Sequence, residues 1–306
     1  MRVAVMGSGG LGGLFGGLLS AAGAEVIFIA RGKHLDAMRS TGLRILSDRG
    51  DVSLDKVDAT DDPKGRPLVD IVIFTVKGQD TKSAAALIEP VVGPDTAIVS
   101  FQNGVEWLDI LSTQYSPDAV MPGATMTPAT IEAPGVIRHI GGSRAITIGE
   151  WHGNKSARVS RFAECCEKAG LEVTISEKIH VDVWSKFVAM TSFSALACLT
   201  RLPLRTIAAT DETRQLATDA MNEIIAISRA RGVVLADDLT SKIFASVEKF
   251  DPSWKTSMCN DLEAGKPIEV DSLSGAVHRL GLELGVPTPV HSVAYRALIS
   301  YARIEK

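Results

Sequence analysis

The sequence predicts an α/β chain in which a doubly wound, mostly parallel sheet is followed by an all-α domain. Three observations predict this class. A glycine-rich turn at residues 1–31 lies between a short apolar run and a helix-compatible run. The β-branched runs at 69–76 and 97–100 contain few polar residues, as expected of strands buried on both faces of a parallel sheet. From residue 179 onward, long segments with helical spacing replace such runs.

Length and composition indicate the number of domains and the class of protein. The chain has 306 residues, which exceeds one ordinary core and fits two domains, expected at 1–177 and 178–306. Hydrophobic residues make up 45% and charged residues 22%, which excludes a disordered chain. The net charge of -4 and the lack of long basic runs argue against a nucleic-acid partner.

The cysteines and apolar runs indicate a compartment. The four cysteines form no C-x-x-C pair and no metal-type cluster with histidine, so we expect no metal site. We interpret them as buried thiols in a reducing cytoplasm. No uninterrupted apolar stretch reaches 18 residues, so no membrane span is expected. The apolar run at 11–22 is too rich in glycine for a signal peptide.

The first 31 residues have the pattern strand, tight turn, helix, strand that binds dinucleotides in a Rossmann-type domain. Three glycines have the spacing G-x-G-x-x-G. The first permits the turn, the second lets the backbone approach a pyrophosphate, and the third lets the helix pack close to the sheet. Amide groups at the helix start then face the phosphates. A glycine-rich surface loop is the alternative. The residues assigned to the cofactor turn are Gly7, Ser8, Gly9, Gly10, Leu11 and Gly12.

The residue after the second strand indicates which cofactor binds. A site for NAD usually has Asp or Glu here, to hold the ribose 2′-OH. This chain has Arg31, with Lys33 and His34 nearby. Because a cation suits a 2′-phosphate, we expect NADP(H). The alternative is that Arg31 is an ordinary solvated charge.

The other elements of the first domain follow from turn and helix-stop signals. We expect a helix at 35–41, a hairpin at 43–54 with its turn at 48–50, a helix near 80–89, short strands at 119–121, 135–140 and 145–148 in the far edge of a mixed sheet, a helix at 156–169 and a last strand at 171–175.

Two polar residues come directly after buried strands. Lys77 follows the run at 69–76, and Asn103 follows the run at 97–100. Ligands bind at the carboxyl ends of strands in open α/β sheets. We therefore expect Lys77 to contact a cofactor phosphate or ribose, and Asn103 to lie near nicotinamide and substrate. The alternative is that each residue caps a turn, which Asn-Gly often does.

The second half predicts helices at 179–199, 210–231, 237–249, 272–283 and 290–303. Lys186 lies early in the first of these, among apolar residues, where a charge is costly unless it is paired or used. Ser257 and Glu269 are further candidates. The ordinary alternatives are a Lys186 that reaches solvent, a helix cap for Ser257, and a first-turn position near the helix dipole for Glu269.

Taken together, the motifs resemble those of the ketopantoate reductase (2-dehydropantoate 2-reductase) family over nearly the whole chain. The matching features are GSGGLG at the N-terminus, Arg31, Val76-Lys77, Asn103-Gly104, PGVIRH from Pro134, Trp184-x-Lys186, the TSM around Ser257 and the IEVD around Glu269. The order and spacing of these motifs are specific, although each one alone is modest.

The resemblance implies a Rossmann domain, an all-helical domain and an active site in the cleft between them, where NADPH reduces the 2-keto group of ketopantoate. It implies that Arg31 and Lys77 hold the adenosine end of NADP(H) and that Asn103 contacts both cofactor and substrate. Lys186 would be the general acid, supported by Glu269. Ser257 would bind the substrate carboxylate, and Ala129 would offer a backbone contact to the cofactor. Many members are dimers, so the resemblance also implies a homodimer.

The sequence departs from the family at two positions. The family commonly has asparagines four and eight residues after the catalytic lysine, where this chain has Met190 and Ser194. These positions bind the substrate, so Ser194 is a candidate substrate contact and Met190 makes the pocket more apolar. Three alternatives stay open: a different 2-keto acid as substrate, a non-catalytic NADP(H)-binding protein, and an NAD-linked hydroxyacid dehydrogenase.

Overall fold

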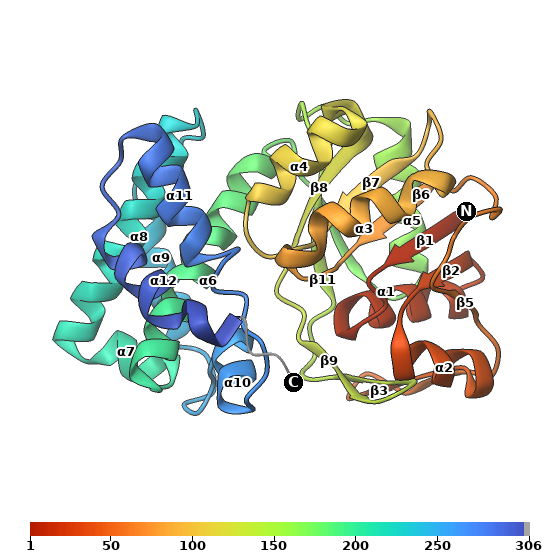
Figure 1. Ribbon diagram of the computed structural model, residues 1–306, viewed down its shortest axis with the longest axis horizontal. Helices are drawn as coiled ribbons and strands as arrows, with labels where there is room; N and C mark the ends of the chain where they lie inside the picture. Colours follow the sequence, from red (N-terminus) through yellow and green to blue (C-terminus); the bar gives the residue numbers. More distant parts are fainter. Residues whose placement is uncertain (303–306) are drawn as a thin grey trace. The chain divides into compact units, whose positions relative to one another are not determined.

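The computed structural model describes residues 1–302 and divides into two compact units (Figure 1). The first unit contains residues 1–102 and 107–179, and the second contains residues 103–106 and the chain from His180 onward. The sequence-based division at residues 177 and 178 differs from this one chiefly in the segment 103–106. That segment follows a strand of the sheet in sequence, but its contacts are with the helical unit.

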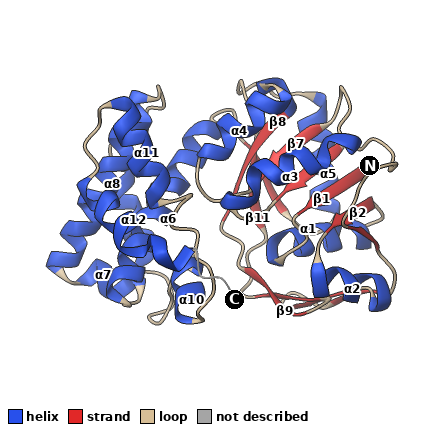
Figure 2. Cartoon of the chain, in the orientation of Figure 1, coloured by secondary structure: helices blue, strands red, loops and turns tan. Residues whose placement is uncertain are grey.

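The first unit is organised around an eight-stranded sheet with the order β12-β11-β8-β7-β6-β1-β2-β5. Neighbouring strands pair in parallel, except that β11 is antiparallel to β8. The strands are β1 (Arg2–Met6), β2 (Glu25–Ile29), β5 (Asp58–Thr60), β6 (Ile71–Phe74), β7 (Ala97–Ser100), β8 (Val120–Thr125), β11 (Ala145–Ile148) and β12 (Glu172–Ile175). This topology, followed by a helical unit, confirms the predicted fold class (Figure 2).

A second sheet has four strands in the order β4-β3-β10-β9. Its members are β3 (Leu43–Ser47), β4 (Val52–Leu54), β9 (Ala129–Ala133) and β10 (Val136–His139). The antiparallel pair β3–β4 confirms the predicted hairpin. The placement of residues 135–140 in the far edge of the main sheet was wrong, because β10 pairs in parallel with β3 instead. A four-residue strand carries no local signal for its partner, so long-range packing decides the pairing.

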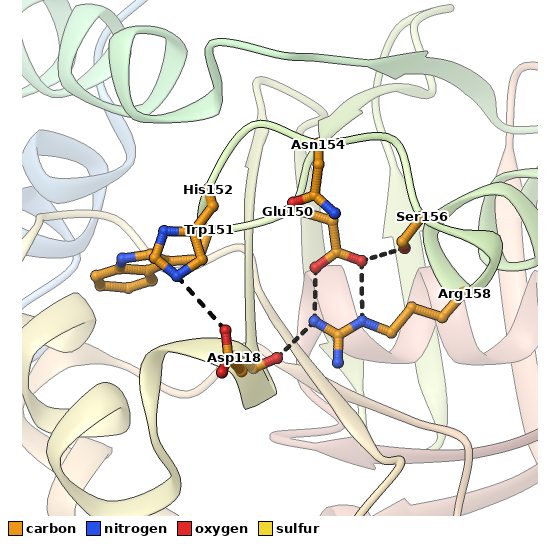
Figure 3. Close-up of a pocket in the computed structure, with 7 residues that line it drawn as sticks. All are labelled: Asp118, Glu150, Trp151, His152, Asn154, Ser156 and Arg158. Carbon is orange, nitrogen blue, oxygen red and sulfur yellow. Dashed lines mark hydrogen bonds and ion pairs between the residues drawn. The ribbon is translucent and has the colours of Figure 1, made fainter.

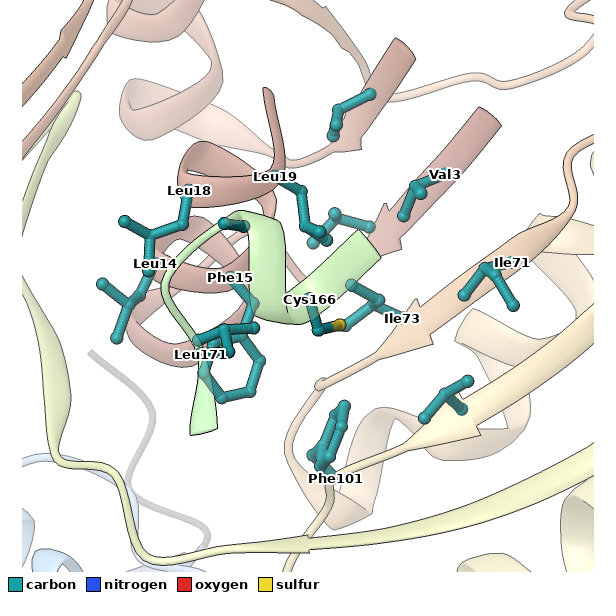
Figure 4. Packing of buried hydrophobic residues seen from close by; sticks show 14 of the residues in the cluster. Val3, Leu14, Phe15, Leu18, Leu19, Ile71, Ile73, Phe101, Cys166 and Leu171 are labelled. Carbon is teal, nitrogen blue, oxygen red and sulfur yellow. The ribbon is translucent and has the colours of Figure 1, made fainter. Parts of the chain in front are cut away.

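The first helix, α1 (Gly10–Ala21), packs between the two sheets, and its extra glycines make this possible. A Cβ on Gly16 would lie 2.6 Å from the Phe28 ring of the main sheet. On Gly17 it would lie 2.6 Å from Ile45, a residue of the second sheet. The helix therefore has no room for side chains at these positions. Phe15 and Leu19 fill the core beside it (Figure 4).

The other helical segments of the first unit are α2 (Gly32–Thr41), η1 (Gly78–Asp80), α3 (Thr81–Ile88), η2 (Glu89–Val91), α4 (Glu106–Tyr115), η3 (Pro117–Ala119) and α5 (Ala157–Lys168). The first residue of α4, Glu106, belongs to the second unit. The sequence reasoning did not predict α4, β5 or β9. The strands β5 and β9 are short, and β9 is mostly exposed, so neither shows a clear apolar pattern.

The second unit contains α6 (Ile179–Thr200), α7 (Leu204–Ala209), α8 (Asp211–Ala230), α9 (Leu239–Val247), α10 (Ser257–Glu263), α11 (Ser274–Leu284) and α12 (Pro289–Ala302). The predicted end of the last helix, Arg303, lies outside the described residues. Helix α6 is long and apolar enough to cross a membrane, with mean hydropathy 1.3, but 67% of that window is buried inside the protein. A core helix has the same pattern.

Buried polar contacts fix the helices of the second unit to one another. The carboxylate of Glu223 on α8 accepts hydrogen bonds from the backbone amides of Val290 and His291, at 2.7 Å and 3.0 Å. Those amides lie in the first turn of α12, which has no carbonyl partners of its own for them. The arrangement caps α12 and holds it against α8.

Candidate active site

The glycine turn after β1 has the backbone geometry that its sequence suggests. Gly7 has φ +91°, a backbone conformation that residues with a side chain rarely adopt. A Cβ on Gly12 would lie 2.3 Å from the Gly7 carbonyl oxygen and 2.5 Å from the Thr75 hydroxyl. Gly7 therefore makes the turn, and Gly12 lets α1 start close to the sheet.

Gly9 differs from its two neighbours in the motif. Its φ is -77°, and a Cβ there would meet no atom within 4 Å. Neither the dihedral φ nor the packing of this chain requires glycine at this position. It is also the N-cap of α1 and makes no side-chain capping bond. An anion that approaches the first turn of the helix does require the space, so the turn fits a dinucleotide pyrophosphate.

Two residues support the turn, and the second was not predicted. Ser8 is 2% exposed, and its hydroxyl donates to the carbonyls of Val5 and Ile29. Thr75, just after β6, donates its hydroxyl to the Gly7 carbonyl at 2.9 Å. It also donates its backbone amide to Met6 at 2.9 Å. No local pattern marks Thr75, because its role comes from the pairing of β6 with β1.

The backbone of β9 reaches the start of α1. A Cβ on Gly10 would lie 2.2 Å from the carbonyl oxygen of Ala129. The structure therefore brings Ala129 next to the glycine turn. Leu11 is partly buried and packs against the core of the first unit.

The predicted adenosine-end residues also gather at this edge of the sheet. Arg31 is the N-cap residue of α2, and its side chain is 85% exposed. It forms an ion pair with Asp80, with Nη2 2.8 Å from Oδ2. Lys77 is the N-cap residue of η1 and is partly buried. Because β2 and β6 flank β1, both cations lie at strand ends beside the glycine turn.

Asn103 belongs to a segment that a network of charges ties to the helical unit. Arg279 on α11 donates to both carboxylate oxygens of Glu106, at 2.9 Å and 2.6 Å. It also donates to the carboxylate of Asp271 at 2.9 Å and to its backbone carbonyl at 2.8 Å. The hydrogen bonds that Arg279 donates to these acids, to Glu106 above all, raise its pKa. The turn itself packs tightly, since a Cβ on Gly104 would lie 2.8 Å from the Ser272 carbonyl oxygen.

Arg279 therefore connects two segments that the sequence had singled out separately. One segment is the Asn103 turn, and the other is the stretch that carries Glu269. The sequence analysis missed Arg279, because an arginine in the middle of a helix is usually a solvated charge. Only the fold shows that it has acids on two sides.

Lys186 and Glu269 interact inside the helical unit. Burial lowers the pKa of Lys186 to about 8, and the charge of Glu269 opposes this shift. Beside the lysine, Trp184 and Phe187 are buried and meet edge to face, with ring centroids 5.7 Å apart. An ammonium whose pKa lies this low releases its proton more readily than an ordinary lysine.

Further along the same helix lie the two positions where this chain departs from the family pattern. Residues four apart share one helix face, so Lys186, Met190 and Ser194 form a row. Met190 is partly buried. Ser194 is 1% exposed, and its hydroxyl has no hydrogen-bond partner among the described residues. An unpaired buried hydroxyl costs about 1–3 kcal/mol.

The position of Ser257 settles one alternative. The N-cap of α10 is Thr256, whose hydroxyl accepts a hydrogen bond from the amide of Cys259. Ser257 is the first helical residue and is exposed. Since Thr256 caps the helix, the hydroxyl of Ser257 has no capping role.

A pocket of about 210 Å³ lies elsewhere, between η3, the loop after β11 and the start of α5 (Figure 3). Arg158 donates to both oxygens of Glu150, and it also bonds the carbonyl of Asp118 at 2.5 Å. Burial raises the pKa of Glu150, but the hydrogen bonds from Arg158 and Ser156 outweigh it, so the pKa is lowered. The pocket lies where β8 begins, at the opposite sheet edge from the glycine turn. We interpret these contacts as structural, because they hold η3, the loop after β11 and the start of α5 together.

Within residues 1–302, no group of three or more His, Cys, Asp or Glu side chains is arranged to hold a metal ion. The four cysteines are free thiols, and only Cys165 is more than slightly exposed.

Comparisons with known proteins extend over both units. Residues 3–153 match the family described as ketopantoate reductase PanE/ApbA, and residues 178–302 match its C-terminal domain. A 2-dehydropantoate 2-reductase from Mesorhizobium japonicum is 31% identical, with 100% of this chain and 99% of the relative covered. The oxidoreductase YkpB from Bacillus subtilis, itself uncharacterized, is 29% identical over 98% of this chain and 99% of its own.

A solved structure agrees with both units. The PanE/ApbA family ketopantoate reductase from Ralstonia eutropha JMP134 superposes with a TM-score of 0.88. It is 32% identical and covers 99% of this chain and 98% of its own. The likeness therefore includes the sheet unit and the helical unit alike.

Proposed function

Because this chain belongs to the ketopantoate reductase family of oxidoreductases, we propose that it reduces the 2-keto group of ketopantoate (2-dehydropantoate) to a hydroxyl with NADPH. The observation that carries the proposal is Lys186 on α6, a partly buried lysine whose pKa burial lowers to about 8 while the charge of Glu269 opposes the shift. A charged group that is withdrawn from water costs free energy unless it is paired or used.

The chain's own residues have distinct tasks in this reaction. The bound nicotinamide supplies the hydride. Negative charge then develops on the keto oxygen, and the ammonium of Lys186 stabilises this charge and donates its proton there. Glu269 keeps enough of the lysine protonated, since a carboxylate nearby favours the charged form.

Binding uses the other site residues. The Gly7 to Gly12 turn takes the pyrophosphate, with Ala129 beside it, and Arg31 and Lys77 take the adenosine end. Asn103 contacts cofactor and substrate, Ser257 offers its hydroxyl to the substrate carboxylate, and Ser194 offers a hydroxyl that has no partner among the described residues. Arg279 binds Glu106, three residues after Asn103, and so restrains the segment that carries Asn103.

A second candidate function is reduction of a different 2-keto acid. The observation that favours it is Met190, whose side chain lies on the face between Lys186 and Ser194 and lacks hydrogen-bond donors. A helix face of this kind suits a keto acid without the 4-hydroxyl. All four cysteines are free thiols, which fits a reducing compartment, and we propose that the protein is cytoplasmic. By analogy with the family, we also propose that it forms a homodimer.

The test is NADPH oxidation, followed by nicotinamide absorbance, with a panel of 2-keto acids that includes ketopantoate. Fast turnover of ketopantoate supports the proposal, and turnover of another keto acid supports the second candidate. If NADPH binds in a fluorescence titration but no keto acid is turned over, the chain is a binding protein and the proposal fails.

A further inference from the structure

The ion pair between Arg31 and Asp80 lies where the preference between the two nicotinamide cofactors is decided. Arg31 follows β2, and Asp80 ends η1, which follows β6. These strands lie on either side of β1, whose end carries the glycine turn. The guanidinium and the carboxylate meet at 2.8 Å.

The two groups have opposite effects on the ribose of a dinucleotide. A carboxylate at this edge accepts a hydrogen bond from a 2′-OH, whereas an arginine accommodates a 2′-phosphate. Most sites contain one of the two. Here both are present and in contact, although the carboxylate comes from a different strand end than the usual one.

Asp80 is the less exposed partner of the pair, and hydrogen bonds hold its backbone. The backbone of Asp80 donates to Lys77 at 2.9 Å and accepts from the Ser83 hydroxyl at 3.0 Å. Its side chain is 32% exposed, against 85% for Arg31. Because exposed ion pairs are weak, the long Arg31 side chain can turn toward a phosphate while the carboxylate stays near. A 2′-phosphate bound by Arg31 would then lie close to a like charge.

We propose that Asp80 is a specificity-determining residue that limits the preference for NADPH over NADH created by Arg31. This inference rests on the proposed function, in which Arg31 binds the 2′-phosphate. Asp80 occupies part of the guanidinium, repels the phosphate and offers an acceptor to the 2′-OH of NADH. The wild-type protein therefore binds both cofactors, with a smaller difference in affinity than Arg31 alone would produce.

The experiment is a fluorescence titration of purified protein with NADPH and with NADH, at fixed ionic strength. The quantity compared is the ratio of the NADH Kd to the NADPH Kd. The variants are Asp80→Asn, Arg31→Ala and the control Glu25→Gln. Glu25 forms a similar exposed pair with Arg2, 3.2 Å apart, where β1 and β2 begin, away from the glycine turn.

We expect Asp80→Asn to raise the ratio about two- to five-fold, the effect of one exposed charge interaction. Arg31→Ala should lower the ratio by about tenfold or more, because charge-assisted hydrogen bonds to the phosphate are lost. Glu25→Gln should leave the ratio unchanged.

The outcomes separate this inference from the proposed function. If Arg31→Ala lowers the ratio but Asp80→Asn does not raise it, the role of Asp80 is refuted and the NADPH assignment stands. If Arg31→Ala leaves the ratio unchanged, the NADPH assignment fails and the inference fails with it. If Glu25→Gln changes the Kd ratio as much as Asp80→Asn does, the effect comes from net charge alone, and the inference is overturned.

Discussion

The glycine turn after β1 is built from backbone, whereas the Lys186 site in the helical unit is built from side chains. In the turn, Gly7 and Gly12 are required by a positive φ and by a carbonyl oxygen 2.3 Å from a would-be Cβ. Around Lys186, the important quantity is the pKa, which burial lowers to about 8 against the charge of Glu269. The first site depends on space and the second on electrostatics, so substitutions should affect them in different ways.

The largest effect should come from removing the lysine. Lys186→Ala should lower kcat by about 10²- to 10⁴-fold, because in the proposed mechanism the developing oxyanion loses both its cation and its proton donor. NADPH affinity, measured by fluorescence titration, should change little. Lys242→Ala is the matched control, since Lys242 is exposed and forms an ion pair with Asp238, 2.9 Å away. Retention of wild-type turnover in Lys186→Ala would remove the lysine from the mechanism.

Two glycine substitutions should distinguish a glycine that is required for packing from one that is required for ligand binding. Gly12→Ala should lower the free energy of unfolding by about 1–3 kcal/mol, since its Cβ collides with backbone. Gly9→Ala should leave the free energy of unfolding nearly unchanged, because its Cβ meets nothing within 4 Å, yet it should weaken NADPH binding. Thermal unfolding and fluorescence titration measure the two quantities. Unchanged NADPH affinity in Gly9→Ala would show that no phosphate approaches this position.

The pH dependence tests the electrostatic site alone. In the proposed mechanism the protonated lysine is the active form, so kcat/KM should fall as pH rises through about 8, the lowered pKa of Lys186. Glu269→Gln removes the charge that favours the protonated form, so the alkaline limb should move to lower pH. The measurement is a pH–rate profile of both proteins. If the alkaline limb of the Glu269→Gln profile stays at the wild-type pH, then another group titrates there, or Glu269 does not affect the pKa of Lys186.

The smallest expected effect concerns substrate choice. Met190→Asn restores an amide on the Lys186 face of α6. It should raise kcat/KM for ketopantoate relative to a keto acid without the 4-hydroxyl by up to about tenfold, the effect of one added hydrogen bond. Steady-state kinetics with both substrates gives the ratio. A fall in the ratio would show that Met190 already suits ketopantoate, and the second candidate substrate class would lose its support.

The sequence alone was enough for those parts of the molecule whose causes are local. The spacing of Gly7, Gly9 and Gly12 between two β-rich runs predicted the turn, because the tight turn requires Gly7, close helix packing requires Gly12, and the approach of a pyrophosphate favours Gly9. Continuous apolar runs predicted β6 and β7, and the predicted hairpin formed as β3 and β4. Helical spacing predicted a helical second half, although it did not indicate α7 or α10.

Only the tertiary structure decided how distant segments meet. It placed β10 beside β3, Thr75 beneath the Gly7 carbonyl, and Arg279 between Glu106 and Asp271. It also paired Arg31 with Asp80, from strand ends that the sequence separates by 49 residues. A residue's own neighbours determine its backbone conformation, but its pKa and its ionic partners depend on groups brought near by folding. The physical reason is that dihedral preferences and steric clashes act within a few residues, whereas charge interactions and burial act through space.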